Sequence, residues 1–183
     1  PCARNTIVRN CYFGMQSDNC IDGFVGADGL VVEDCVFNNG DHVAMEIKNQ
    51  FRSKDDEHFT AGTSLPGKRI CRNIFVNNCE FLGNHYMAVV SVTASDDYVG
   101  AEPLYNVHFT NCRMPNLDGV PFAIGDYMVE DVTVDNLILP KTMTKGQIYL
   151  YGENTVLRNI DNESLVIIVH GKGLIERCKV KEI

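Results

Sequence analysis

The stretch TIVRNCYF (6–13) decides the fold, because it returns six more times along the 183-residue chain. Each copy keeps an apolar residue three positions before the cysteine site and, in most copies, a large apolar residue two positions after it. The other copies are LVVEDCVF (30–37), IFVNNCEF (74–81), VHFTNCRM (107–114), VTVDNLIL (132–139), TVLRNIDN (155–162) and GLIERCKV (173–180). Equivalent positions are 24, 44, 33, 25, 23 and 18 residues apart. A basic period of about two dozen residues, lengthened by insertions, predicts stacked structural repeats.

The residue directly before the cysteine site predicts a corner in each copy. Side chains alternate with period two in a strand, so the apolar positions before this residue cannot run in phase with those after it. The residues at the break are Asn10, Asp34, Asn78, Asn111, Asn136, Asn159 and Arg177. Asparagine tolerates the left-handed backbone conformation that such a corner needs. Stacked asparagines can also hydrogen-bond from copy to copy.

The next position predicts an inward stack of small apolar groups. It holds Cys11, Cys35, Cys79, Cys112, Leu137, Ile160 and Cys178. The eight cysteines contain no C-x-x-C pair, and a chain of this length can bury a core without disulfides. We therefore expect the column cysteines to be free thiols that pack as small hydrophobic residues. Cys2, Cys20 and Cys71 fall outside the column and are the candidates for a bridge or a reactive thiol.

A third strand is predicted after the turn in most copies. The segments are CIDGFVGA (20–27), VAMEIKN (43–49), MAVVSVTA (87–94), VPFAIG (120–125), QIYLYG (147–152) and LVIIVHG (165–171). Strand, corner, short strand, turn and long strand, repeated about seven times, describe an all-β right-handed parallel β-helix. A leucine-rich repeat would need regularly spaced leucines and a helical segment, and a β-sandwich would not keep Asn and Cys in register.

The repeat resembles the pectate-lyase-like β-helix superfamily, which includes polysaccharide lyases, polygalacturonases, epimerases and bacteriophage tailspikes. This resemblance rests on a pattern that recurs over essentially the whole chain: two apolar residues at alternate positions, one further residue, and then N-C-x-F. It implies one β-helix domain over residues 1–183 and identifies architecture better than activity. Because no capping helix is evident at either end, we expect part of a longer chain or a member of a homo-oligomer.

Composition narrows the choice of partners. With 16 Lys and Arg against 24 Asp and Glu, the net charge is −8, which disfavours nucleic acid as a partner. No window approaches 18 consecutive apolar residues, so no membrane span is predicted. The resemblance instead implies a polysaccharide, with an extracellular or virion-associated location.

Two long insertions indicate where a site would lie. The segments 49–69 and 93–103 both follow predicted long strands, and insertions stacked on one side of a repeat protein commonly form its binding face. If His42 and His85 are equivalent, Glu46 and Lys48 point outward and stack near Val89 and Ser91. These two histidines, Glu46 and Lys48 are the catalytic candidates, suited to proton transfer in lyase or glycosidase chemistry. The alternative for Glu46 and Lys48 is a solvated ion pair.

Further residues are candidates for substrate binding. They are Ser91, Tyr86, Tyr98, Asp126, Glu153 and His170. Tyrosine rings can stack on sugar rings. For Tyr149 and Tyr151 we expect that one belongs to the core. We expect no cofactor; the loop acids Asp55, Asp56, Asp96 and Asp97 are of the type that binds Ca²⁺, with solvated loop charges as the alternative.

The sequence leaves two functions open. The first is a carbohydrate-active domain, lyase-like or hydrolase-like, of bacterial or phage origin. The second is a tailspike segment or surface adhesin that binds glycan without cleaving it. Two family signatures are altered, since RMPNLD (113–118) ends in Asp where pectate lyases have Arg, and VHGKG (169–173) begins with Val where polygalacturonases have Gly. The sequence therefore leaves it open whether the protein is an enzyme.

Overall fold

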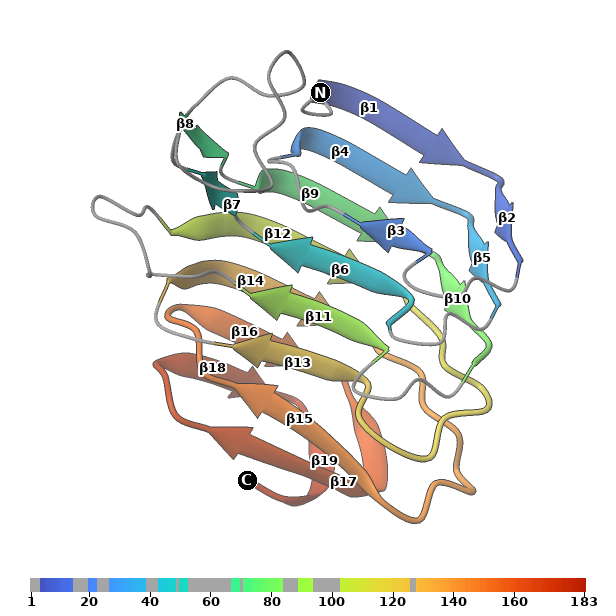
Figure 1. The fold of residues 1–183 in the computed structure, drawn as a ribbon. Helices are drawn as coiled ribbons and strands as arrows, with labels where there is room; N and C mark the ends of the chain where they lie inside the picture. Colours follow the sequence, from blue (N-terminus) through green and yellow to red (C-terminus); the bar gives the residue numbers. More distant parts are fainter. Residues whose placement is uncertain are drawn as a thin grey trace.

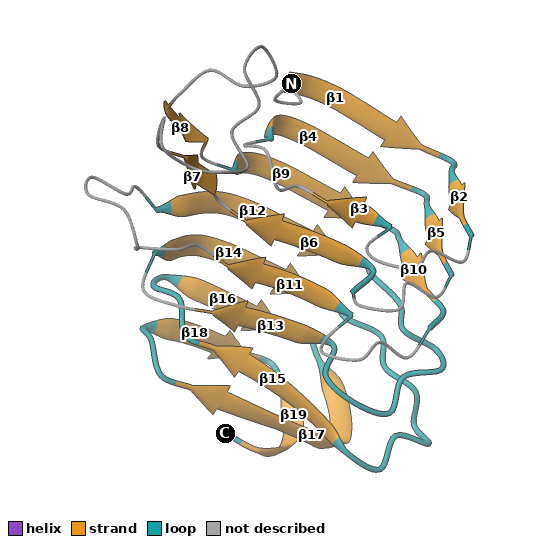
Figure 2. Ribbon diagram, viewed as in Figure 1, coloured by secondary structure: helices purple, strands orange, loops and turns teal. Residues whose placement is uncertain are grey.

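The protein is built from long parallel β-sheets. The computed structural model describes residues 4–14, 20–22, 27–38, 43–48, 50–52, 67–69, 71–83, 89–93, 103–125 and 128–183, and these residues contain strands and no helix (Figure 2). Two seven-stranded parallel sheets and one three-stranded parallel sheet carry almost all of the strands (Figure 1).

Successive copies of the repeat contribute one strand each to the two large sheets. The first sheet contains β1 (Arg4–Arg9), β4 (Asp28–Glu33), β9 (Arg72–Asn77), β12 (Leu104–Thr110), β14 (Val129–Asp135), β16 (Thr155–Arg158) and β18 (Gly173–Glu176). The second sheet contains β3 (Ile21–Asp22), β6 (Met45–Lys48), β11 (Val90–Thr93), β13 (Phe122–Gly125), β15 (Gly146–Leu150), β17 (Asp161–Val169) and β19 (Lys179–Glu182). In both sheets the spatial order of the strands is their order in the chain.

The third sheet is short and lies between the other two along the chain. It contains β2 (Tyr12–Phe13), β5 (Val36–Phe37) and β10 (Glu80–Phe81), and single bridges extend it to Arg113 and Ile138. A separate antiparallel pair, β7 (Gln50–Arg52) and β8 (Gly67–Arg69), lies within the first insertion.

The strand register confirms the alignment of the copies. Thr6 pairs with Leu30, Leu30 with Ile74, and Ile74 with Val107. Val107 then pairs with Val132, and Val156 joins Thr133 to Leu174. Each pair joins residues that the sequence pattern had placed in one column. The repeats are therefore stacked one on the next, an arrangement compatible with a parallel β-helix.

The predicted corner is present in every copy. All seven residues at the break have positive φ, from 50° at Arg177 to 56° at Asn111. Their side chains also bond between copies, as Asn136 Nδ2 donates to Asn111 Oδ1 at 2.8 Å and Asn78 Nδ2 to Asp34 Oδ1 at 2.7 Å. Asn111 and Asn159 instead donate to Asn77 and Asp135, the residues before the corner.

A second left-handed column begins the strands of the first sheet, five residues before the corner. Its members are Asn5, Gly29, Asn73, Asn106, Asp131 and Asn154. Asn106 Nδ2 donates to Asn73 Oδ1 at 2.6 Å. Gly29 has φ +76°, and a Cβ there would lie 2.8 Å from Asn5 Oδ1, so backbone conformation and space both favour glycine. This column was not predicted from the sequence, although five of its six members are Asn or Asp.

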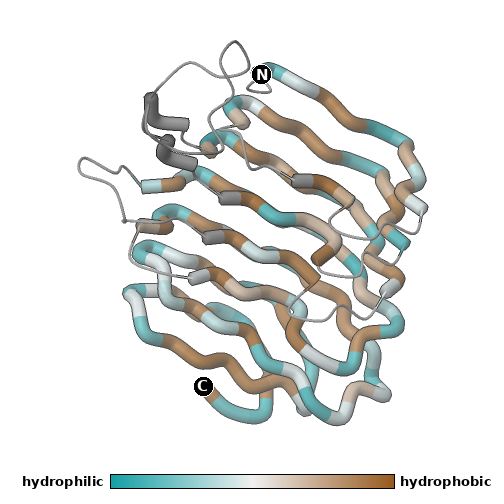
Figure 3. Tube along the Cα trace, in the orientation of Figure 1, coloured by the Kyte–Doolittle hydropathy of each residue, from teal (hydrophilic) through white to brown (hydrophobic). Residues whose placement is uncertain are grey.

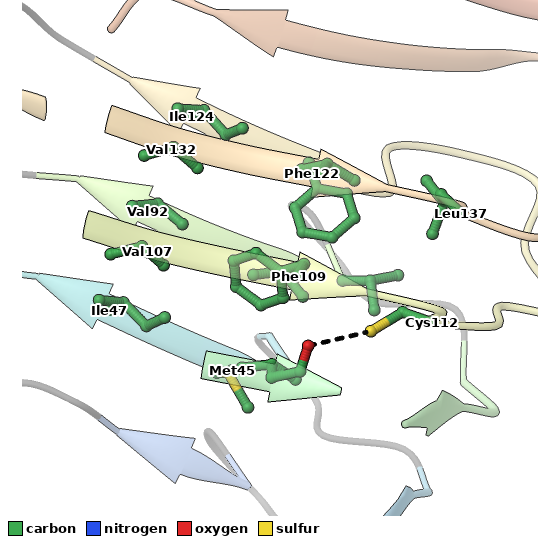
Figure 4. Close-up of a cluster of buried hydrophobic side chains, with 14 of the residues drawn as sticks. Met45, Ile47, Val92, Val107, Phe109, Cys112, Phe122, Ile124, Val132 and Leu137 are labelled. Atoms are coloured by element: carbon green, nitrogen blue, oxygen red, sulfur yellow. Dashed lines mark hydrogen bonds between the residues drawn. The ribbon is translucent and has the colours of Figure 1, made fainter. Parts of the chain in front are cut away.

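The core fills the space between the sheets (Figure 4). Phe109 of β12 meets Phe122 of β13 edge to face at 4.9 Å, which joins the first sheet to the second. Buried and less buried residues alternate along strands such as β12 and β14, and apolar residues are frequent along the strands (Figure 3). Phe13, Phe37 and Phe81 stack with centroids 4.7 and 4.8 Å apart, which confirms the column predicted two residues after the cysteine.

The cysteine column is buried in the middle copies. Cys35, Cys79 and Cys112 are at most 1% exposed, whereas Cys11 of the first copy is exposed. The Cys79 thiol donates to Asn77 O at 3.4 Å. Cys71 is also fully buried, in a second inward column that includes Ala27 and Leu104. That burial favours packing as the role of Cys71 over the bridge or reactive thiol considered from the sequence.

These thiols should resist native labelling. Burial raises the pKa of Cys79 to about 12 and that of Cys112 to about 11, and the thiolate is the reactive form. We expect a thiol reagent to modify Cys11 in the native protein, whereas Cys35, Cys79 and Cys112 react only after unfolding, as peptide mapping by mass spectrometry will show. Labelling of all three at the rate of Cys11 would contradict the inward stack.

The same burial gives stability a dependence on alkaline pH. The folded pKa of Cys79 lies above the unfolded value of 9.0, so folding favours the protonated thiol. This contribution is complete below pH 9 and is lost as pH rises from 9 toward about 12. Midpoints of urea unfolding measured across this range should therefore fall with pH.

Candidate functional site

The outer face of the second sheet is the candidate site. Backbone pairing places one residue of each strand in a single row, which runs from β3 to β17. The row is Asp22, Glu46, Ser91, Ala123, Tyr149 and Ile168. Members described beyond β3 are partly exposed, while neighbours in the same strands such as Ile47, Val92 and Leu150 are buried. From β6 to β17 this row therefore faces solvent, because side chains alternate between the two faces of a strand.

Both insertions leave the same edge of this face. They follow β6 and β11, which are neighbouring parallel strands with Lys48 opposite Thr93. In parallel strands the carboxyl ends meet at one edge, so the segments that follow start side by side. Of the insertions, residues 49, 53–66 and 94–102 lie outside the described residues.

The structure brings two of the catalytic and binding candidates together. Glu46 pairs with Ser91 across β6 and β11. The assumed equivalence of His42 and His85 implies a spacing of 43 residues, but the register has 45, so Glu46 lies opposite Ser91 rather than Val89. Val89 is fully buried. A shift of two residues keeps the strand phase, which is why the outward assignment of Glu46 still holds.

Other candidates lie in turns farther along the sheet. Glu153 follows β15 and forms an ion pair with Lys172, with 3.6 Å between Oε2 and Nζ. His170 follows β17. Four strand steps separate β6 from β17, about 19 Å at the usual strand spacing. Glu46 and His170 therefore do not form one catalytic cluster. His42, His85, Tyr86, Tyr98 and Asp126 lie outside the described residues, as do the loop acids considered for Ca²⁺.

Aromatic side chains form a partly exposed cluster at the end of β15 and directly after β15 and β17, which we call the aromatic platform: Tyr149, Tyr151 and His170. The ring centroids of Tyr149 and Tyr151 are 6.1 Å apart, and Tyr151 meets His170 edge to face at 4.7 Å. Tyr151 is 37% exposed and Tyr149 is half-buried. The expectation that one tyrosine belongs to the core was wrong, because residues two apart in a strand share a face.

Small residues adjoin the platform on the next strand. Ala123 pairs directly with Tyr149, and Gly125 lies two residues farther along β13. On the other side, Ile168 of β17 pairs with Tyr149 and is partly exposed. The tyrosine rings thus lie beside a surface of small and apolar residues. Sequence reasoning missed Gln147 and Ile168, whose only signal was their position in the outward phase of their strands.

The outer face of the first sheet is different, because its charged groups pair with one another. Arg158 Nε donates to Asp135 Oδ2 at 2.8 Å, and Arg72 donates from Nε and Nη2 to Asp28 Oδ2. The hydrogen bond from Arg72 holds the pKa of Asp28 below its usual value. These ion pairs join neighbouring copies of the repeat on the first sheet, and we therefore take the outer face of the second sheet as the candidate site.

Comparison with known proteins does not assign the chain to a family. No protein-family model, curated protein or solved structure matches the chain. Within the described ranges, no three His, Cys, Asp or Glu residues gather as metal ligands. Those ranges also hold no helix long and apolar enough to cross a membrane. The superfamily resemblance therefore stays a prediction from the repeat.

Proposed function

We propose that the chain is a right-handed parallel β-helix of about seven coils, whose second sheet binds a polysaccharide. The aromatic platform carries this proposal. Aromatic rings pack against the apolar faces of sugars, and Tyr and His add polar tips for hydroxyl groups. The platform lies on a rigid strand, since β15 pairs with β13 and β17 on its two sides. A non-catalytic glycan-binding module, as in a tailspike segment or adhesin, needs no more than this.

The experiment is a binding screen with matched tyrosine variants. Soluble neutral and acidic polysaccharides are titrated calorimetrically against the wild type, Tyr151→Ala and Tyr149→Ala. Loss of one stacking ring should weaken binding about tenfold. The control is Tyr12→Ala, which removes a tyrosine that is 64% exposed on the third sheet. Equal effects of Tyr12→Ala and Tyr151→Ala, or no glycan binding at all, would reject the platform.

A second candidate function is glycan cleavage, and one observation favours it. Backbone pairing sets Asp22 of β3 opposite Glu46 of β6. Glycosidases act through a pair of acidic residues, so two acidic residues on neighbouring strands favour this chemistry. The screen therefore also measures new reducing ends and unsaturated products. If they form, Glu46→Gln should lower turnover about 10²- to 10⁴-fold with little change in binding; if none form, the binding module stands alone.

A further inference from the structure

Two adjoining hollows lie at the start of the last strands of the second sheet, opposite the edge that carries the insertions. The larger, of about 480 Å³, is lined by Asp118, Gly119, Val120, Thr144, Lys145, Gly146, Gln147, Ser164, Val166 and Lys181. The smaller, of about 360 Å³, is lined by Lys141, Asp161, Asn162, Glu163, Ser164 and Lys179. Ser164 is common to both. We call the larger one the lysine hollow.

The wall of the lysine hollow is fixed by Asp118. Its Oδ1 accepts hydrogen bonds from the backbone N–H groups of Thr144 and Lys145, at 2.8 and 3.0 Å. The Thr144 hydroxyl donates to Oδ2 at 3.0 Å. These bonds hold the pKa of Asp118 below its usual value. The carboxylate is thus engaged in holding the turn that presents Lys145, and the hollow exists before any ligand arrives.

The charge of the lysine hollow is opposite to that of the chain. Two lysines line it against the one structural carboxylate, although the chain as a whole carries −8. In the smaller hollow, by contrast, two lysines meet two acids, and Lys179 is paired with Glu163. The excess of positive charge on this part of the sheet is therefore concentrated between Lys145 and Lys181.

One strand joins the lysine hollow to the aromatic platform. Gln147 lines the hollow, and its Oε1 accepts a hydrogen bond from the Tyr149 hydroxyl at 2.6 Å. Tyr149, in turn, lies beside Tyr151. From Gln147 to Tyr151 the outward side chains span about 13 Å along β15. A short saccharide could therefore touch the lysines and the tyrosines together.

We propose that the lysine hollow binds an anionic substituent, a carboxylate or a sulfate, of the glycan whose rings stack on the aromatic platform. This inference rests on the proposed function. It orients the saccharide along β15, across the width of the sheet, with its charged group at Lys145 and Lys181. Gln147 and Ser164 supply neutral hydrogen-bonding groups at the same end, and Val166 packs against the sugar ring.

The test compares oligosaccharides of equal length. Neutral, uronate-containing and sulfated tetrasaccharides, and inorganic sulfate alone, are titrated against the wild type and Lys145→Gln/Lys181→Gln. The double variant should bind the preferred charged tetrasaccharide about tenfold or more weakly, with binding of the neutral one changed less than about twofold. Higher salt should weaken only the charged ligand in the wild type. The control is Arg9→Gln/Arg113→Gln, which removes the same net charge away from the second sheet.

The outcomes separate the two proposals. Equal losses for charged and neutral ligands, or no preference for a charged ligand, would overturn the inference. Inorganic sulfate that binds as tightly as the sulfated tetrasaccharide would also overturn it, because a simple anion site needs no glycan. In each of these cases the proposed function still stands if Tyr151→Ala weakens glycan binding. If no tetrasaccharide binds the wild type, both proposals fail.

Discussion

Gly171→Ala is expected to destabilise the protein by about 3 kcal/mol or more, at or beyond the upper end of the usual cost of overpacking. A Cβ at Gly171 would lie 2.0 Å from the carbonyl oxygen of Gly152 and 2.9 Å from that of Tyr151. Both contacts are with backbone, which cannot rotate away as a side chain can. The N–H of Gly171 also donates to Leu150 O at 3.3 Å, so the turn cannot shift outward without loss of that bond.

Gly119→Ala is the matched control for this substitution. A Cβ at Gly119 meets its first neighbour, Leu117 Cδ1, at 3.9 Å, an ordinary contact. Its free energy of unfolding in urea should remain within about 0.5 kcal/mol of the wild type. Unfolding of Gly171→Ala at the same urea concentration as Gly119→Ala would contradict the close approach of Gly171 to the backbone of Gly152. Hydrogen exchange should show the loss of protection first in β16 to β19, because repeats contact only their neighbours.

The register of the first sheet could be predicted from the sequence, because one column of residues has a single physical reason in every copy. Only a residue that tolerates positive φ fits the corner, and Asn or Asp occupies it in six of seven copies. The second left-handed column was equally visible as Asn5, Asn73, Asn106 and Asn154. It was not predicted because the copies of the repeat were aligned on the cysteines, and the change in apolar phase lies beside these cysteines.

The end of the chain was harder to predict. β17 runs without interruption through Asp161–Val169, so the short strand and the long strand of that copy merge. β19 then returns to the second sheet with a register shift between Asn162 and Val166 of its partner. The shorter step of 18 residues leaves too few residues for a separate turn. A pattern that assumes equal copies cannot anticipate this merger.

Only part of the candidate site could be predicted from the sequence pattern. Strand phase was sufficient to place Glu46 and Ser91 on one face. It was not sufficient to predict a site, because the lysine hollow depends on hydrogen bonds between two turns, one at Asp118 and one at Thr144 and Lys145. A turn whose geometry is set by single hydrogen bonds has no periodic sequence pattern from which it could be predicted. Residues two apart in a strand share a face, so this period applied to β15 would have predicted that Tyr149 and Tyr151 point to the same side.

The second large effect on stability is expected for a substitution in the stack of phenylalanines. Phe37 is fully buried between Phe13 and Phe81, with interplanar angles of 2° and 12°. Phe37→Ala would remove the middle ring and leave a cavity that the rigid coils on both sides cannot close. We expect a loss of about 3–5 kcal/mol in the free energy of unfolding. Phe37→Leu, which retains most of the volume, should cost clearly less.

Phe75→Ala provides the comparison within the same fold, because it deletes the same ring from a surface position. Phe75 is 40% exposed on the outer face of the first sheet and stacks on His108 at 5.2 Å. Its removal forfeits one partly solvated stacking contact and opens no cavity, so a loss of about 1 kcal/mol is expected. Urea unfolding of the three variants, followed by circular dichroism, gives the order. A cost for Phe37→Ala no greater than that for Phe75→Ala would mean that the column does not support the stack, and that neighbouring coils are held together by the backbone ladders and polar columns alone.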